Sequence, residues 1–188
     1  MVRRIVLRGA VLVVALCAGA SLDVALSRRA PSAAAVTPRA VRTVPRHSLL
    51  HSRELWATID VCNPAKEPDT VGIRGSMPGD GHEKDAMYMR FQLEYLDPKS
   101  KAWSVPTHGA DSGFIAVGAA KTGRQGGSSF QLGAPKSQPG YTMRGIVTFQ
   151  WRRAGRVVHQ ATRTTSAGHS NVAKADPPGY SAAQCTIP

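Results

Sequence analysis

Regular alternation of apolar and polar side chains constrains the fold of this chain more than any other feature. In the segment 87–97 every second side chain from Met87 to Tyr95 is apolar, and the positions between these carry polar groups. Residues 141–151 follow nearly the same period of two. Successive side chains of a β-strand point to opposite faces. Both segments are therefore predicted to be long strands with one buried and one solvated face.

Six further segments have the length and composition of short strands, with turn-forming residues between them. They are residues 55–62, 71–75, 102–105, 113–117, 129–132 and 156–165. No segment in this part of the sequence carries a helical period over three turns. Seven to nine short antiparallel strands within about 130 residues predict an all-β fold, a single β-sandwich over residues 53–188.

The last two predicted strands form a hairpin that can be connected in two ways. A two-residue turn at Ala154-Gly155 is one alternative. A three-residue loop, 153–155, is the other, and it puts Gly155 at the left-handed position of a bulge, where glycine is favoured. We predict the three-residue loop, which places Val157, His159 and Ala161 beside Trp151, Phe149 and Val147 on the apolar face of the preceding strand.

The first 35 residues predict a secretory signal peptide. Three arginines among the first eight residues precede twelve uncharged residues, 9–20, and a basic segment before a short apolar run directs export. A membrane-spanning helix needs about 20 apolar residues, so no transmembrane segment is expected in the mature chain. Cleavage is expected after Ala35, with Ala20 as the alternative site.

The N-terminal segment leaves the export route open. Residues 3–8 are similar to the twin-arginine signal of proteins exported after folding, although ordinary export of the unfolded chain is the interpretation we favour. Cys17 follows a leucine inside the apolar run and is interpreted as an apolar residue rather than a lipidated one. Residues 36–52 contain two prolines and three arginines without any period, and are predicted to form a disordered basic linker.

The chain is strongly basic, with 24 Lys and Arg against 12 Asp and Glu and a formal net charge of +12. Such a charge favours anionic partners. Cleavage after Ala35 leaves two of the three cysteines, Cys62 and Cys185, in a compartment where disulfides persist. They are predicted to pair, and closing so long a loop should stabilise the fold by about 4–5 kcal/mol on the chain-entropy model.

One segment of this chain resembles a late strand of immunoglobulin-like and fibronectin type III-like domains. It is Tyr141-x-Met143-Arg144-Gly145-Ile146-Val147-x-Phe149-x-Trp151. At the level of pattern, residues 53–187 resemble small secreted bacterial proteins of unknown function that fold as such a sandwich. The resemblance implies an immunoglobulin-like sandwich with a tyrosine near the start of that strand.

Catalytic motifs are missing from the sequence: G-x-S-x-G, H-E-x-x-H, C-x-x-C and the Walker motif do not occur. Ala110-Asp111-Ser112-Gly113 is similar to the sequence around a serine-protease nucleophile, but an alanine replaces its first glycine. A turn before a strand is the interpretation we favour. We expect no enzymatic activity and no cofactor.

Four arginines are the candidate binding residues of the mature chain: Arg144, Arg152, Arg153 and Arg156. They are predicted to converge at one end of the last hairpin, where they would attract phosphate- or carboxylate-bearing polymers of the cell envelope. Nucleic acid is not an expected partner, because export removes the chain from it and no aromatic platform interleaves the basic residues.

Two metal hypotheses concern the segment 76–89. Copper(I) prefers thioether and imidazole ligands, so the alternative copper site consists of Met77, His82, Met87 and Met89. Calcium prefers oxygen ligands, which Asp80, Glu83 and Asp85 could supply. For the three acidic residues a solvated loop is the interpretation we favour.

The sequence thus predicts a secreted, disulfide-bonded, non-enzymatic binding module that engages an anionic envelope polymer. One alternative is an extracytoplasmic copper-binding protein. The other is a ligand or inhibitor of another extracellular protein, acting through the loops 76–84 and 119–128.

Overall fold

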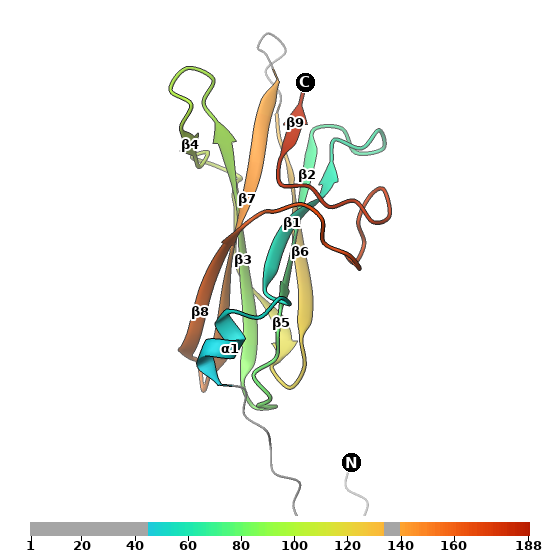
Figure 1. Ribbon diagram of the computed structural model, residues 1–188. Helices are drawn as coiled ribbons and strands as arrows, with labels where there is room; N and C mark the ends of the chain where they lie inside the picture. The colour runs from blue at the N-terminus through green and yellow to red at the C-terminus, as the bar shows by residue number, and fades with distance from the viewer. Residues whose placement is uncertain (1–44, 134–139) are drawn as a thin grey trace, which may run out of the picture. The chain divides into compact units, whose positions relative to one another are not determined.

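The computed structural model describes residues 45–133 and 140–188 and shows an all-β sandwich of antiparallel strands (Figure 1). The three-stranded sheet has the order β1-β2-β6, formed by β1 (Trp56–Cys62), β2 (Thr70–Met77) and β6 (Arg124–Gln131). The predicted fold class is confirmed. The predicted signal peptide, Cys17 and linker residues 36–44 lie outside the described residues.

The six-stranded sheet is built around two long central strands, β3 (Ala86–Leu96) and β7 (Tyr141–Arg153). The second edge of β3 carries β4 (Trp103–Ser104) and β5 (Asp111–Ala119), and the second edge of β7 carries β8 (Arg156–Thr164) and β9 (Cys185–Ile187). All of these pairs are antiparallel. The two central strands are the two segments that the alternation predicts as long strands.

The core lies between the two sheets and follows the predicted alternation. On β3 the inward residues Met87, Met89, Phe91 and Leu93 are completely buried, and on β7 the same holds for residues such as Trp151. The Trp151 indole also donates a hydrogen bond of 3.0 Å to the backbone oxygen of Pro78. This bond fixes the loop after β2 against the core.

The β7–β8 connection differs from the predicted three-residue loop, which is wrong. Ala154 and Gly155, both with positive φ (47° and 79°), form a two-residue turn that leaves Arg153 opposite Arg156. A bulge follows, because Arg152 pairs with Val157 whereas Trp151 pairs with His159. Because of the bulge, Val157 does not lie beside Trp151 as predicted. His159 and Ala161 do lie on the predicted face, but each is two residues out of the predicted register.

Strands β5 and β6 are longer than predicted. The glycine-rich segment 119–128, predicted to be a loop, contains the last residue of β5 and the first five residues of β6. A side chain at Gly126 would come within 2.8 Å of Val117 and 3.0 Å of the Met89 sulfur. The glycines of β6 therefore make room for the core of a strand rather than for a turn.

The predicted linker also differs from the structure at its C-terminal end. Helix α1 (Arg46–Leu50) is ordered, and Leu49 is completely buried in the core. An Arg163 guanidinium nitrogen donates a hydrogen bond of 2.6 Å to the Leu50 oxygen. The sandwich therefore includes residues 46–52, which the sequence places in the disordered linker.

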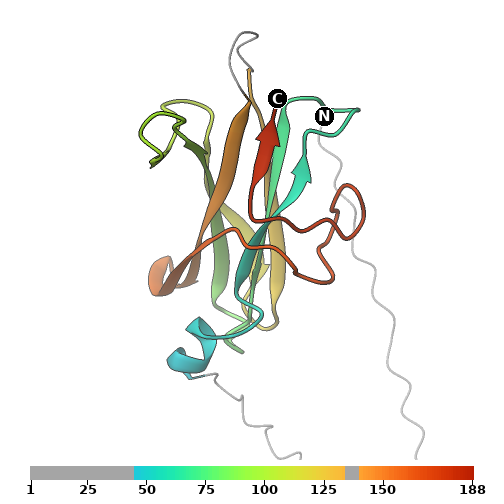
Figure 2. The same ribbon diagram turned by 45° about the horizontal axis from the view of Figure 1, so that its top comes forward.

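The disulfide between Cys62 and Cys185 is confirmed, with 5.5 Å between the two Cα atoms. It joins β1 of one sheet to β9 of the other. The segment between β8 and β9 runs along β1, where Ile59 pairs with Ala182 (Figure 2). Within the described ranges, no helix combines the length and the apolar character that a membrane crossing requires.

Candidate functional site

The four candidate arginines do not form one patch. Arg144 pairs with Glu94 at 2.6 Å, and its guanidinium lies 4.2 Å from the centre of the Trp103 ring. Arg144 and Arg152 are eight positions apart on β7, a distance of about 27 Å at roughly 3.4 Å per residue. The prediction that Arg144 joins the hairpin end is wrong, because the strand is extended throughout.

Arg153 is bound to an acidic residue. Its guanidinium donates hydrogen bonds to both oxygens of the Asp85 carboxylate, at 2.9 Å to Oδ1 and at 2.7 and 3.2 Å to Oδ2. These bonds hold the pKa of Asp85 below its ordinary value. The positive charge of Arg153 is therefore largely compensated within the fold.

Arg152 is arranged differently, on the outer face of the six-stranded sheet. Its guanidinium lies 4.1 Å from the Tyr88 ring centre and 4.9 Å from that of Phe114. Two of its nitrogens donate to the side-chain oxygen of Gln150, at 2.8 and 2.6 Å. We call the surface formed by Tyr88, Phe114, Gln150 and Arg152 the Arg152 face.

No carboxylate in the described ranges forms an ion pair with Arg152 or with the exposed Arg156. The register puts Arg156 opposite Arg153, so its side chain is not on the Arg152 face. A guanidinium has five N–H donors, and only two of the Arg152 nitrogens are engaged with Gln150. Arg152 thus retains donors for an outside acceptor.

A second group of polar residues lies in the loop between β2 and β3. Asp80 and Asp85 are each only 2% exposed, so the predicted solvated acidic loop is wrong for both. The third acidic residue, Glu83, has a side chain that is 74% exposed and contacts Lys121 at 3.3 Å. The structure therefore turns Glu83 away from the other two carboxylates.

The loop holds its carboxylates in place through backbone contacts. Asp80 Oδ1 accepts a hydrogen bond of 2.8 Å from the His82 backbone, and the Ala120 backbone donates to the Asp85 backbone oxygen at 2.8 Å. A side chain at Gly79 would lie 2.6 Å from the Ala120 oxygen. Only glycine lets the chain pass this close to the loop after β5.

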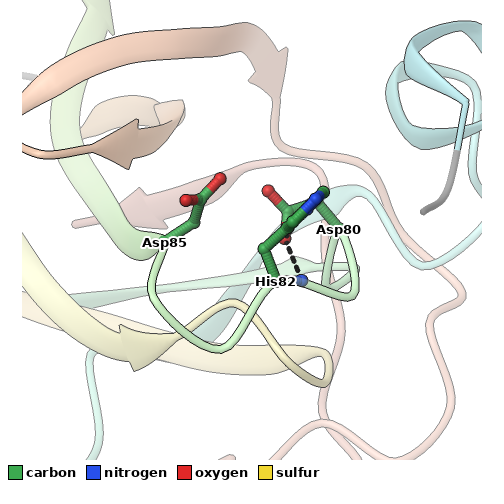
Figure 3. Close-up of side chains that lie close together, drawn as sticks. All are labelled: Asp80, His82 and Asp85. Carbon is green, nitrogen blue, oxygen red and sulfur yellow. Dashed lines mark hydrogen bonds and ion pairs between the residues drawn. The ribbon is translucent and has the colours of Figure 1, made fainter. Parts of the chain in front are cut away.

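Asp80, His82 and Asp85 form the closest group of metal-ligating side chains in the part of the chain that the structure describes (Figure 3). One ligand atom from each lies within 4.8 Å of the other two. Asp80 Oδ2 and His82 Nδ1 are buried and have no hydrogen-bond partner within residues 45–133 and 140–188. Burial raises the pKa of Asp80, and the neighbouring Asp85 carboxylate raises it further.

The copper hypothesis is not supported by the placement of its residues. Met77, Met87 and Met89 are completely buried members of the hydrophobic core, where methionine packs as an apolar side chain. His82, in contrast, lies in the loop beside Asp80, with 3.5 Å between Nδ1 and Oδ1. Of the four proposed copper ligands, only His82 belongs to a polar cluster.

The loops considered as protein-binding elements are partly engaged in the fold. The Gly81 backbone donates to the Ala120 oxygen at 3.1 Å, so the two loops contact each other. Residues 124–128 belong to β6. The serine of the protease-like motif is also structural, since Ser112 Oγ accepts a hydrogen bond of 2.9 Å from the Phe91 backbone.

Comparison with known proteins identifies no family for this chain. No family model matches it, and no curated protein matches its sequence. Among solved structures, a putative β-galactosidase from Bacteroides fragilis aligns with a TM-score of 0.31 and 11% sequence identity. The alignment covers 61% of this chain and 16% of that protein.

Proposed function

We propose that the protein is a secreted, non-enzymatic binding module with an immunoglobulin-like sandwich, and that its Arg152 face binds an anionic ligand of the cell envelope. The carrying observation is the Arg152 guanidinium, which stacks over two aromatic rings without a carboxylate partner among the described residues. Arginine and aromatic residues are enriched where proteins bind partners.

The strand order supports the immunoglobulin-like assignment. Strands β1, β2 and β6 pack as the first, second and fifth strands of such domains do, and β3, β7 and β8 correspond to the three strands of the opposite sheet. The chain crosses between the sheets from β2 to β3, from β5 to β6 and from β6 to β7, as this topology requires.

Two observations support export. The disulfide joins residues 123 positions apart, and such bonds persist in oxidising compartments outside the cytosol. The first 35 residues have the composition of a signal peptide.

Retention on isolated cell envelopes tests the ligand class. The variant Arg152→Gln removes the charge of the Arg152 face, and we expect it to lose most of the retention at about 50 mM salt. The matched control, Lys66→Gln, removes the same charge from an exposed lysine elsewhere and should be retained like the wild type. Equal retention of the two variants would refute the proposal.

A second candidate function, binding of another extracellular protein, has one specific observation in its favour. Phe114 and Val157, which lie beside Arg152, are large apolar side chains that are 37% and 48% exposed, and exposed apolar groups near an arginine suit a protein interface. Phe114→Ala, which also removes one ring under Arg152, distinguishes the two. Weaker capture of an extracellular protein, with unchanged envelope retention, would favour the protein partner.

A further inference from the structure

We propose that Asp80, His82 and Asp85 bind one divalent transition-metal ion of the zinc type in the loop that connects β2 to β3. This site is distinct from the predicted copper site and from the predicted calcium loop. Its proposed ligands are His82 from the copper hypothesis and Asp80 and Asp85 from the calcium hypothesis, and no methionine is a ligand.

The first argument is that two carboxylates face each other in a buried place. Asp80 and Asp85 are each 2% exposed, and burying a carboxylate is unfavourable unless a positive charge or hydrogen-bond donors compensate it. Arg153 donates hydrogen bonds to Asp85 and none to Asp80, whose Oδ1 accepts one from the His82 backbone. Asp80 Oδ2 has no hydrogen-bond partner among the residues that the structure describes, and the Asp80 carboxylate extends towards Asp85 (Figure 3).

The second argument is that the free atoms are metal ligands. His82 Nδ1 is buried beside Asp80 and has no hydrogen-bond partner in the described part of the chain. The three ligand atoms lie within 4.8 Å of one another. A zinc ion bonded at about 2.0–2.2 Å draws its ligands to roughly 3.0–3.5 Å apart, so a shift on the order of an ångström closes the site.

The ligand set selects the metal. Three protein ligands that include an imidazole are typical of zinc sites with an open fourth position, and the His82 side chain is 33% exposed, which leaves access for water. Calcium requires six to eight oxygen ligands. Glu83, the nearest additional carboxylate in the loop, is turned outward, so the oxygen count stays low.

Arg153 occupies one side of Asp85 and competes with the ion. Its side chain is 54% exposed, so it can leave Asp85 without disturbing the core. Removing this charge should therefore favour the metal ion, since two cations no longer share one carboxylate.

Equilibrium dialysis of the full chain against Zn²⁺, after purification without chelator, tests the site. We expect one zinc per chain. Asp80→Asn and His82→Gln should each weaken binding at least tenfold, while the control Glu83→Gln, in the same loop, should bind like the wild type. Arg153→Gln should bind more tightly than the wild type.

Melting temperatures measured in chelator separate a lost site from a lost fold. Asparagine is nearly isosteric with aspartate and carries no buried charge. Asp80→Asn should therefore melt no lower than the wild type without metal, and added Zn²⁺ should raise the melting temperature of the wild type but not of this variant. The proposal would be overturned if the wild type bound zinc no more tightly than Asp80→Asn and His82→Gln do. Stoichiometric calcium binding in place of zinc would also overturn it.

Discussion

Carboxylate pairing decides which arginines remain available to a ligand. Asp60, Asp85, Glu94 and Asp111 each hold one arginine: Arg74, Arg153, Arg144 and Arg90, respectively. The sequence identifies the arginines but does not tell which carboxylate each will meet, because the partners are 14 to 68 residues away. Consequently two of the four predicted polyanion-binding arginines are compensated within the fold.

The Arg90–Asp111 pair predicts a small acid-dependent loss of stability. Hydrogen bonds from Arg90 hold the pKa of Asp111 below its ordinary value of 3.8, so the unfolded chain takes up the proton more readily. The pair should stabilise the fold above pH 3.8 and lose that contribution as the pH falls further. Both side chains are about one third exposed, so the contribution should stay below about 1 kcal/mol.

Urea unfolding of the wild type and Asp111→Asn at about pH 6 and about pH 2.5 measures this effect. The difference in unfolding free energy between the two proteins should shrink towards the lower pH. A difference that grows on acidification would show that Asp111 is not stabilised as the anion.

Among the elements, the two long central strands are the most predictable. The short strands β1 and β8 also lie close to their predicted bounds, whereas β6 begins earlier than predicted and β9 was not predicted. Each of β3 and β7 buries one face, so its period of two appears in the sequence. The register of β8 could not be predicted, because it depends on a bulge at Val158 that no pattern in the sequence indicates. Strand β6 was partly missed because Gly126 and Gly127 are typical of loops, although here they accommodate neighbouring side chains.

Gly145→Ala tests how closely the two sheets approach. A Cβ at Gly145 would lie 2.8 Å from the Ile73 Cδ1 atom and from the Thr165 methyl group. Such overpacking should lower the unfolding free energy by about 1–3 kcal/mol. The control Gly133→Ala meets no atom within 4 Å and should change the stability little, as measured by urea unfolding; equal effects would contradict the packing argument.

Across the whole molecule, the disulfide and the segment before β9 tie the C-terminus to the first strand. The pairing of Cys62 with Cys185 could be predicted because only these two cysteines follow the predicted cleavage site. The start of the domain could not be predicted as well. Leu49 is a core residue, but two neighbouring leucines among prolines and arginines carry no period that indicates burial.

Removing the disulfide should destabilise the sandwich strongly. On the chain-entropy model, a loop of this length makes the bond worth about 4–5 kcal/mol. The variant with both Cys62→Ser and Cys185→Ser should therefore unfold at a lower urea concentration, and wild type in reductant should follow it. A double variant that unfolds at the same urea concentration as the oxidised wild type would refute the stabilising role of the disulfide.

The sequence identifies all three residues of the candidate metal cluster as possible ligands, but not as members of one site. Asp80, His82 and Asp85 are close together in the chain, and the sequence assigned His82 to one hypothesis and the carboxylates to another. The three side chains come together because the loop folds back against Ala120. That contact joins segments whose proximity no local pattern predicts.

The salt dependence of envelope binding tests the central claim most directly. The chain from Val36 to Pro188 would be sedimented with isolated envelopes at about 50 mM and about 500 mM salt, a range over which screening of exposed charges becomes strong. Binding of an anionic polymer through Arg152 predicts retention at the lower salt and release at the higher one. Absence of retention at both concentrations, or equal retention at both, would contradict the claim.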